Sequence, residues 1–176
     1  MKLVKLYKRV DGTLHYWESW SNGGNCATVH WGVVGHEGQS QTMESDSCSN
    51  LEQKLQTEID RLSLDDYASI PVEDHCVLLI EYGINGMGRL NDLRKRHALE
   101  SRMQETLGLT GLGICDGGSI GSGTMEVCCF VVDFEIGKKS HRRRLERYGV
   151  WQLHIASMIR MLPAEGIGRR AALPPS

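Results

Sequence analysis

The first third of the chain alternates short apolar segments with polar and glycine-containing ones, a pattern typical of β-strands joined by tight turns. The run at residues 26–31 predicts one of these strands, because it is rich in β-branched and aromatic side chains. A helix is expected over residues 49–62, because leucine and isoleucine recur there at helical spacing. Ser49 and Glu52 have the spacing of a capping box at its start.

The rest of the chain predicts the order strand, helix, strand, strand, helix, strand. The long apolar run at 76–82 and the strict alternation at 125–134 are the strongest strand signals in this part. This order is typical of a ferredoxin-like sandwich, in which one four-stranded antiparallel sheet carries two helices on one face. The expected elements are strands 76–82, 112–120, 125–134 and 150–158, a helix from Asn91 to about Leu107 stopped by Gly108, and a helix 135–148.

A polar segment at 63–74, punctuated by Pro71, separates these two patterns. We therefore predict an α+β protein with a β-rich domain at 1–66 and an α+β domain at 75–162. The tail from residue 163 to 176 contains arginine, glycine and proline and is predicted to be disordered.

The third predicted strand ends in Trp31-Gly32-Val33, and Gly35 and Gly38 follow at once. With the strands and helix around it, this segment makes residues 1–62 resemble the WGR domain, a small, mostly antiparallel β module named after a Trp-Gly-Arg signature. WGR domains occur in poly(ADP-ribose) polymerases, where they contact DNA ends and neighbouring domains, and in bacterial proteins. Val33 stands where the family has arginine. The resemblance implies a β module whose strands begin at Leu6 and then cover residues 15–20, 27–31 and 41–43. The chain lacks the arginine with which DNA-binding relatives contact nucleic acid.

Charge separates the two halves. Residues 1–66 carry six basic and ten acidic side chains, and an acidic module is a poor phosphate binder. The second predicted helix of the other half is basic, which suggests a site for nucleic acid or an acidic protein. The alternative is a solvated helix face whose long side chains cover apolar surface. The residues of this possible anionic-partner site are Lys138, Lys139, Arg142, Arg143 and Arg144.

The glycine-rich stretch 116–124 is the one segment that suggests a small-molecule site, through Asp116, Ser119 and Ser122. It lacks the Gly-Lys-Ser/Thr ending of a phosphate-binding loop and leads into a strand rather than a helix. We expect a bulged hairpin there, with a ligand pocket as the alternative. No candidate nucleophile has an assignable base, and we expect no cofactor and no metal site.

The six cysteines form no CxxC pair, so we expect reduced thiols in a cytoplasmic protein. Residues 1–10 lack the apolar core of a signal peptide, and no apolar run is long enough to cross a bilayer. We predict a non-catalytic bacterial binding protein that engages another protein through Trp20, Trp31 and His36. Two alternatives stay open: an immunity-type protein that sequesters a toxin, and nucleic-acid binding through the basic helix.

Overall fold

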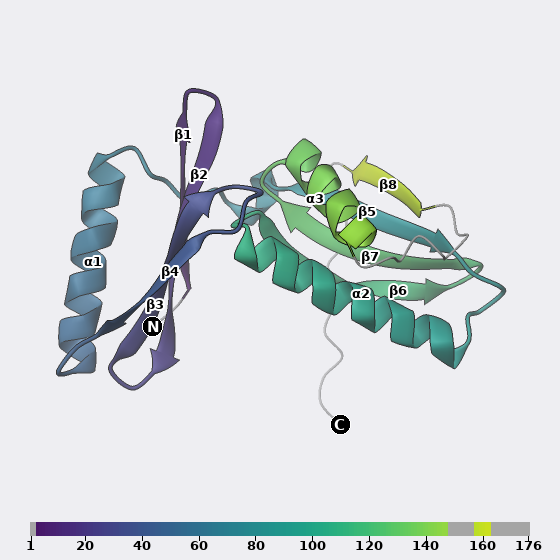
Figure 1. The fold of residues 1–176 in the computed structure, drawn as a ribbon, viewed down its shortest axis with the longest axis horizontal. Helices are drawn as coiled ribbons and strands as arrows, with labels where there is room; N and C mark the ends of the chain where they lie inside the picture. The colour runs from purple at the N-terminus through teal and green to yellow at the C-terminus, as the bar shows by residue number, and fades with distance from the viewer. Residues whose placement is uncertain (1–2, 148–156, 163–176) are drawn as a thin grey trace.

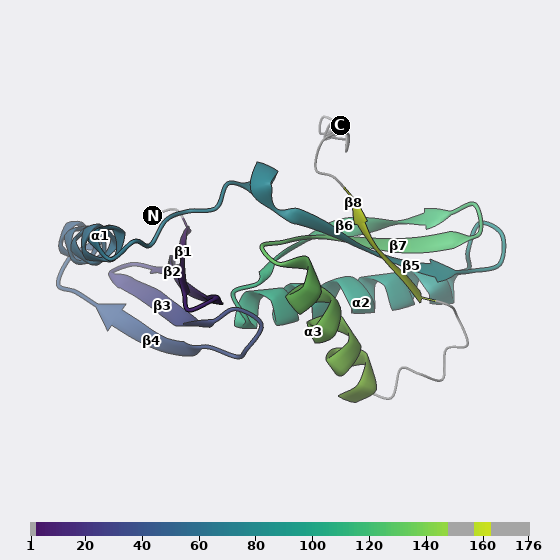
Figure 2. The same cartoon turned by 90° about the horizontal axis from the view of Figure 1, so that it is seen from above.

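The computed structural model describes residues 3–147 and 157–162, and of residues 143–147 and 157–162 it describes the backbone alone. The protein is a mixed α/β structure with two antiparallel sheets of four strands each. The sheets follow one another along the long axis of the molecule (Figure 1). The first sheet lies between helix α1 (Cys48–Leu64) and the second half of the chain (Figure 2).

The first sheet is a meander whose strands lie in chain order. Its strands are β1 (Val4–Val10), β2 (Thr13–Gly23), β3 (Cys26–Val33) and β4 (Gln39–Glu44), each antiparallel to the next. The register sets Trp17 opposite Trp31, so both side chains lie on the same face. The four strands expected from the sequence are confirmed, although β2 and β3 extend beyond the predicted ranges.

Helix α1 covers one face of this sheet. Leu51, Leu55 and Leu62 are buried, as their spacing predicts, and pack in one cluster with residues such as Trp17 and Val29. The predicted cap was wrong, because the side chain of Ser47 accepts the Asn50 N–H at 3.2 Å. The helix therefore begins at Cys48, earlier than expected, and ends at Leu64.

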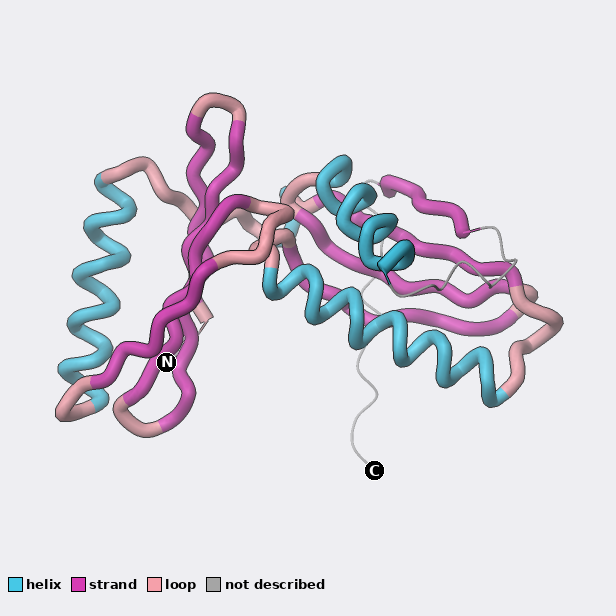
Figure 3. The backbone as a smooth tube through the Cα atoms, viewed as in Figure 1, coloured by secondary structure: helices cyan, strands magenta, loops and turns pink. Residues whose placement is uncertain are grey.

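The second sheet has the spatial order β6-β7-β5-β8, with every neighbouring pair antiparallel. Its strands are β5 (Cys76–Gly83), β6 (Gly113–Gly121), β7 (Thr124–Val131) and β8 (Ser157–Leu162). Helices α2 (Leu90–Leu109) and α3 (Phe134–Arg147) lie on one face of this sheet (Figures 2 and 3). A single 3-10 turn, Val72–Asp74, precedes β5.

Several boundaries in this half differ from the prediction. Helix α2 begins at Leu90 rather than Asn91, because Arg89 is the residue at its N-cap. Gly108 does not stop α2, which continues to Leu109. Strand β7 ends at Val131 because Asp133 accepts the Ile136 N–H at 3.0 Å and so begins α3. The described part of the last strand is Ser157–Leu162, which pairs Ile159 with Ile80 of β5 and so extends four residues past the predicted end at 158. The rest of the predicted range, and the predicted tail, lie outside the described residues.

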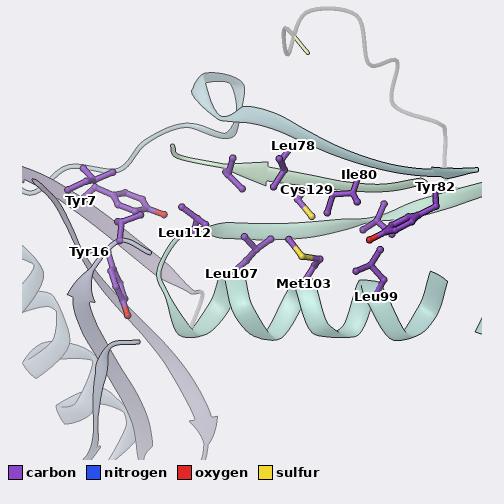
Figure 4. Close-up of a cluster of buried hydrophobic side chains, with 14 of the residues drawn as sticks. Tyr7, Tyr16, Leu78, Ile80, Tyr82, Leu99, Met103, Leu107, Leu112 and Cys129 are labelled. Atoms are coloured by element: carbon purple, nitrogen blue, oxygen red, sulfur yellow. The ribbon is translucent and has the colours of Figure 1, made fainter. Parts of the chain in front are cut away.

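The two sheets share one hydrophobic cluster at the C-terminal end of α2. Tyr7 and Tyr16 of the first sheet enter this cluster beside Leu107 and Leu112 of the second half (Figure 4). The Tyr7 hydroxyl donates to the Gly111 carbonyl at 3.1 Å. The contact therefore combines burial of two aromatic rings with a directed hydrogen bond, and it fixes the first sheet against the end of α2.

Candidate protein-binding surface

The side chains expected to meet a partner are divided between the two faces of the first sheet. Trp31 is paired with Trp17 and points to the α1 side. Trp20 is paired with Thr28 and lies on the opposite face, where its ring meets His30 edge to face at 6.2 Å. Because neighbours along a strand alternate faces, Trp20 and Trp31 do not form one surface.

Trp31 lies at the floor of a groove of about 700 Å³ between the sheet and α1. Apolar side chains from three strands and from the segment after α1 form its base, and polar residues of β4 and α1 form its rim. The lining residues are Trp17, Val29, Trp31, Gln41, Met43, Lys54, Thr57, Glu58, Arg61, Leu62 and Tyr67. Met43 and Tyr67 were missed in the sequence, because neither lies in a pattern that points to a shared surface.

The rim of this groove carries opposite charges. Arg61 donates two hydrogen bonds to Glu58, at 2.6 and 3.0 Å, and this contact holds the pKa of the Glu58 carboxyl below its usual value. Lys54 lies one turn before this pair and reaches the Glu44 carbonyl at 3.5 Å. An apolar floor with a charged, hydrogen-bonding rim is the usual composition of a protein interface.

A second hollow of about 380 Å³ lies at the end of β3 and again includes Trp31. Its other lining residues are Gly32, Val33, His36, Glu37, Gly38 and Gln39. Trp31 and His36 thus line one hollow, whereas Trp20 does not line it. Val33 contributes an apolar side chain to this hollow.

Backbone contacts with the second half hold the loop after β3 in place. Gly35 N–H donates to the Thr110 carbonyl at 3.0 Å, and Gly38 N–H donates to the Leu109 carbonyl at 3.1 Å. A side chain at Gly38 would collide with the Tyr16 hydroxyl. The hollow beside Trp31 is therefore built on a loop fixed by both sheets.

A buried chain of polar groups lies beneath this loop. Glu18 contacts Lys5 at 3.1 Å and His30 Nδ1 at 2.7 Å, and His30 Nε2 lies 3.0 Å from the Tyr16 hydroxyl. The Tyr16 hydroxyl lies 3.3 Å from the Leu109 carbonyl in α2. Nδ1 of the ring donates to Glu18, because a carboxylate only accepts.

This carboxylate, imidazole and hydroxyl resemble the parts of a nucleophilic site, but their surroundings favour a structural role. Tyr16, Glu18 and His30 are each no more than 5 % exposed. Burial, and then the charge of Glu18, raise the pKa of the Tyr16 hydroxyl, whereas an activated nucleophile needs a lowered one. We conclude that these buried polar groups connect the first sheet to the end of α2.

The glycine-rich segment forms an irregular hairpin. The β6–β7 register shifts between Cys115 and Gly117, which leaves Asp116 at a bulge, and Ser122 lies in the turn with a φ of 52°. Ser119 donates to Glu126 on β7 at 2.9 Å. Asp116, Ser119 and Ser122 line neither of the two hollows beside Trp31.

Two cysteines face each other across this hairpin. Cys115 is paired with Cys129, and hydrogen bonding to the Cys129 thiol lowers the pKa of Cys115 to about 7. Burial raises the pKa of Cys128, on the other face of β7, to about 11. The hydrogen bond with Cys115 also raises the pKa of Cys129, so the two strands carry one readily ionised thiol, Cys115, and two that stay protonated at neutral pH.

The basic residues of α3 differ in exposure. Lys139 and Arg142 are exposed and Lys138 is half-buried, while the side chains of Arg143 and Arg144 lie outside the described part. The basic residues of α2 do not simply extend this surface: Lys95 lies 3.7 Å from Asp92, and Arg96 lies 3.1 Å from Glu100. The acidic partners reduce the charge that α2 offers to an anionic ligand.

Comparison of the chain with protein-family models, curated proteins and solved structures finds no match. The described residues contain no group of three histidine, cysteine or acidic side chains arranged to hold a metal ion. Among the helices described, none has the length and apolar character needed to cross a membrane.

Proposed function

We propose that the chain is a non-catalytic binding protein whose groove between α1 and the first sheet accepts a segment of a partner protein. The observation that carries this proposal is the joint placement of Trp31, Met43 and Tyr67 around one groove with a charged rim. Aromatic residues and methionine are enriched at protein interfaces, where a few of them supply most of the binding energy. Sequestration of a toxin is a narrower form of the same proposal.

We further infer that residues 1–62 form a WGR-like module and residues 75–162 a ferredoxin-like domain. For the first, the support is a four-stranded meander closed by α1, with Trp31 and its glycines at the end of β3. For the second, the support is the order βαββαβ with the two helices on one face of an antiparallel sheet. Because one fold hosts many functions, the proposed binding depends on the groove and not on these assignments.

The test is affinity capture on the full chain, with proteins from the organism that encodes it as the probe. Trp31→Ala removes the floor of the groove, and Thr57→Arg blocks it from α1 while leaving the core intact. Gln53→Arg is the matched control, because it adds the same charge on the same helix but lines a different hollow. Loss of an interface tryptophan costs about 2 kcal/mol or more, roughly a thirtyfold weaker Kd.

Proteins that bind through the groove are expected on the wild type and on Gln53→Arg and strongly reduced on the other two variants. Equal thermal stability of Thr57→Arg and Gln53→Arg shows that the loss is not due to unfolding. If every captured protein binds all four chains equally, the groove is not the binding site.

Nucleic-acid binding through α3 is the alternative, favoured by the exposed Lys139 and Arg142. It predicts binding of duplex DNA or RNA that weakens steeply with salt, and a smaller salt slope when Lys138, Lys139 and Arg142 are all replaced by alanine. Binding without salt dependence, or an unchanged slope in that variant, excludes this site.

A further inference from the structure

The outer strands of the two sheets differ in how their free backbone groups are satisfied. An open edge is a template for pairing with another chain, and proteins normally cover or interrupt it. On the outer side of β1, Tyr7 exchanges backbone hydrogen bonds of 2.8 and 2.9 Å with Ala68. On the outer side of β6, the register is interrupted by a bulge, and Cys115 N–H donates to the side chain of Gln104 at 2.9 Å.

Strand β4 is the outer strand at the other end of the first sheet, and it points alternate backbone groups away from β3. Ser45 N–H donates to the Asn25 carbonyl at 3.2 Å, which continues the β3–β4 register by one pair. Hydrogen-bonded and non-bonded pairs alternate along an antiparallel ladder. Because Ser45 bonds toward β3, every second residue before it also bonds toward β3, and the residues between them do not. The N–H and C=O groups of Ser40, Thr42 and Glu44 therefore point outward.

The usual protection of an edge strand is missing along this strand. Residues 39–43 contain no charge and no proline, and the β3–β4 register runs through six pairs without a bulge. Every residue of β4 except the half-buried Met43 is exposed. Among the described residues, the contact made to the outward groups is that of Lys54 with the carbonyl of Glu44, at the end of the strand.

We propose that β4 pairs antiparallel with β4 of a second copy of this chain, about a two-fold axis at Thr42. In this register Thr42 meets Thr42 of the second copy, and Ser40 meets Glu44. Each copy donates and accepts backbone hydrogen bonds at the three outward residues. Glu44 is the one charged residue of the strand, and in this register it pairs with Ser40 of the second copy rather than with the second Glu44. The two edges therefore match in charge as well as in register, because no like charges face each other.

The pairing joins two first sheets into one continuous sheet. The two-fold axis is perpendicular to that sheet, so both α1 helices lie on the same face and the two Trp31 grooves adjoin. Gln41 and Met43, whose side chains point to the α1 side, become neighbours of Met43 and Gln41 of the second copy. A six-residue strand pair is smaller than a standard interface, so we expect a dissociation constant in roughly the micromolar range.

The first test measures the mass of the full chain by analytical ultracentrifugation from about 1 µM to about 1 mM, a range that spans the expected affinity. The mass should rise from 19.7 kDa toward twice that value with concentration. Thr42→Lys should keep the chain monomeric, because it adds a charge at the axis. Thr13→Lys, the same substitution at an exposed position of β2, should dimerise like the wild type.

The second test fixes the register. In a Cys48→Ser background, which removes the exposed native thiol, Thr42→Cys places two thiols across the axis at a Cα separation of about 5.5 Å, suitable for a disulfide. Ser40→Cys places them roughly 14 Å apart. With oxidised glutathione as the oxidant, the first variant should form a covalent dimer and the second should not.

A chain that stays monomeric at every concentration overturns the proposal, and so does a Thr42→Lys variant that dimerises as well as Thr13→Lys. Equal cross-linking of the two cysteine variants overturns the register. None of these results affects the groove proposal, because Trp31 and α1 lie on a face of the sheet and not at its edge.

Discussion

His141 provides the sharpest prediction about stability, because it is a titratable side chain enclosed in the second half of the protein. It lies on α3, is 1 % exposed, and its Nε2 has no hydrogen-bond partner among the described residues. Burial, and to a smaller extent the charge of Arg142, lower its pKa from 6.5 to about 4. The folded protein therefore holds this ring neutral at pH values where the unfolded chain protonates it.

The direction of the pH effect follows from proton uptake. At pH 7 the imidazole is largely neutral in both states, and below the unfolded pKa of 6.5 the unfolded chain binds a proton that the folded chain does not. Stability is therefore lost as the pH falls through 6.5, and the loss levels off near the folded pKa of about 4. The linkage relation gives about 2 kcal/mol lost at pH 5 and about 3 kcal/mol at pH 4.

Urea unfolding followed by tryptophan fluorescence at pH 7 and pH 5 measures this loss. His141→Leu fills the same space with an apolar side chain that does not titrate. Between pH 7 and pH 5 its free energy of unfolding should therefore fall by about 2 kcal/mol less than that of the wild type. Carboxylates such as Glu58 titrate in both proteins and cancel in the difference. Ser101→Leu, at an exposed position without a titratable side chain, is the control and should follow the wild type. Equal pH dependence of His141→Leu and wild type would refute the reasoning.

The contact between the sheets and the thiols of the second sheet give three further predictions. Gly111→Ala should lower the free energy of unfolding by about 3 kcal/mol, because the φ of this residue is 61° and a side chain would overlap the Tyr16 ring. Gly108→Ala, with open space around it, should raise the free energy of unfolding by up to about 1 kcal/mol. Equal urea midpoints for the two variants would contradict this prediction. Tyr16→Phe should lower the free energy of unfolding by about 1–3 kcal/mol in the same assay, because it removes a buried hydroxyl from its hydrogen-bond partners. An unchanged urea midpoint would show that these buried polar groups contribute nothing to stability. Alkylation of Cys115 by iodoacetamide should reach half its maximal rate near pH 7 while Cys128 reacts slowly, as peptide mass spectrometry can show; equal rates for the two thiols would contradict their pKa shifts.

Periodicity was enough to predict which faces are buried. Val127, Cys129 and Val131 alternate along β7 and are fully buried, as their spacing requires. The leucines of α1 face the first sheet for the same reason. The cap of α1 was wrong because Ser47 and Ser49 both precede the apolar positions, and only the backbone conformation shows which side chain accepts a hydrogen bond.

The ends of α2 show where local pattern fails. Leu90 is apolar but 65 % exposed, because it is the first residue of the helix and lies at its end. Gly108 was taken as the stop, yet the residue that requires glycine is Gly111, where a tyrosine from the other sheet approaches. That requirement arises from a contact between residues about 95 positions apart, which no window on the sequence contains.

The glycines that follow Trp31 show the same limit at the candidate site. A glycine that forms a turn commonly has a positive φ, but of Gly32, Gly35 and Gly38 only Gly35 has one, 87°. Gly38 is needed because the Tyr16 hydroxyl and the His30 ring occupy the space of a side chain, and Gly35 also lies against Ile136 of α3. The glycine pattern thus reflects close packing within the first sheet at Gly38 and against α3 at Gly35, as much as turn geometry. The backbone N–H groups of Gly35 and Gly38 also donate to the carbonyls of Thr110 and Leu109, so the shape of the Trp31 hollow depends on the second half of the protein as well.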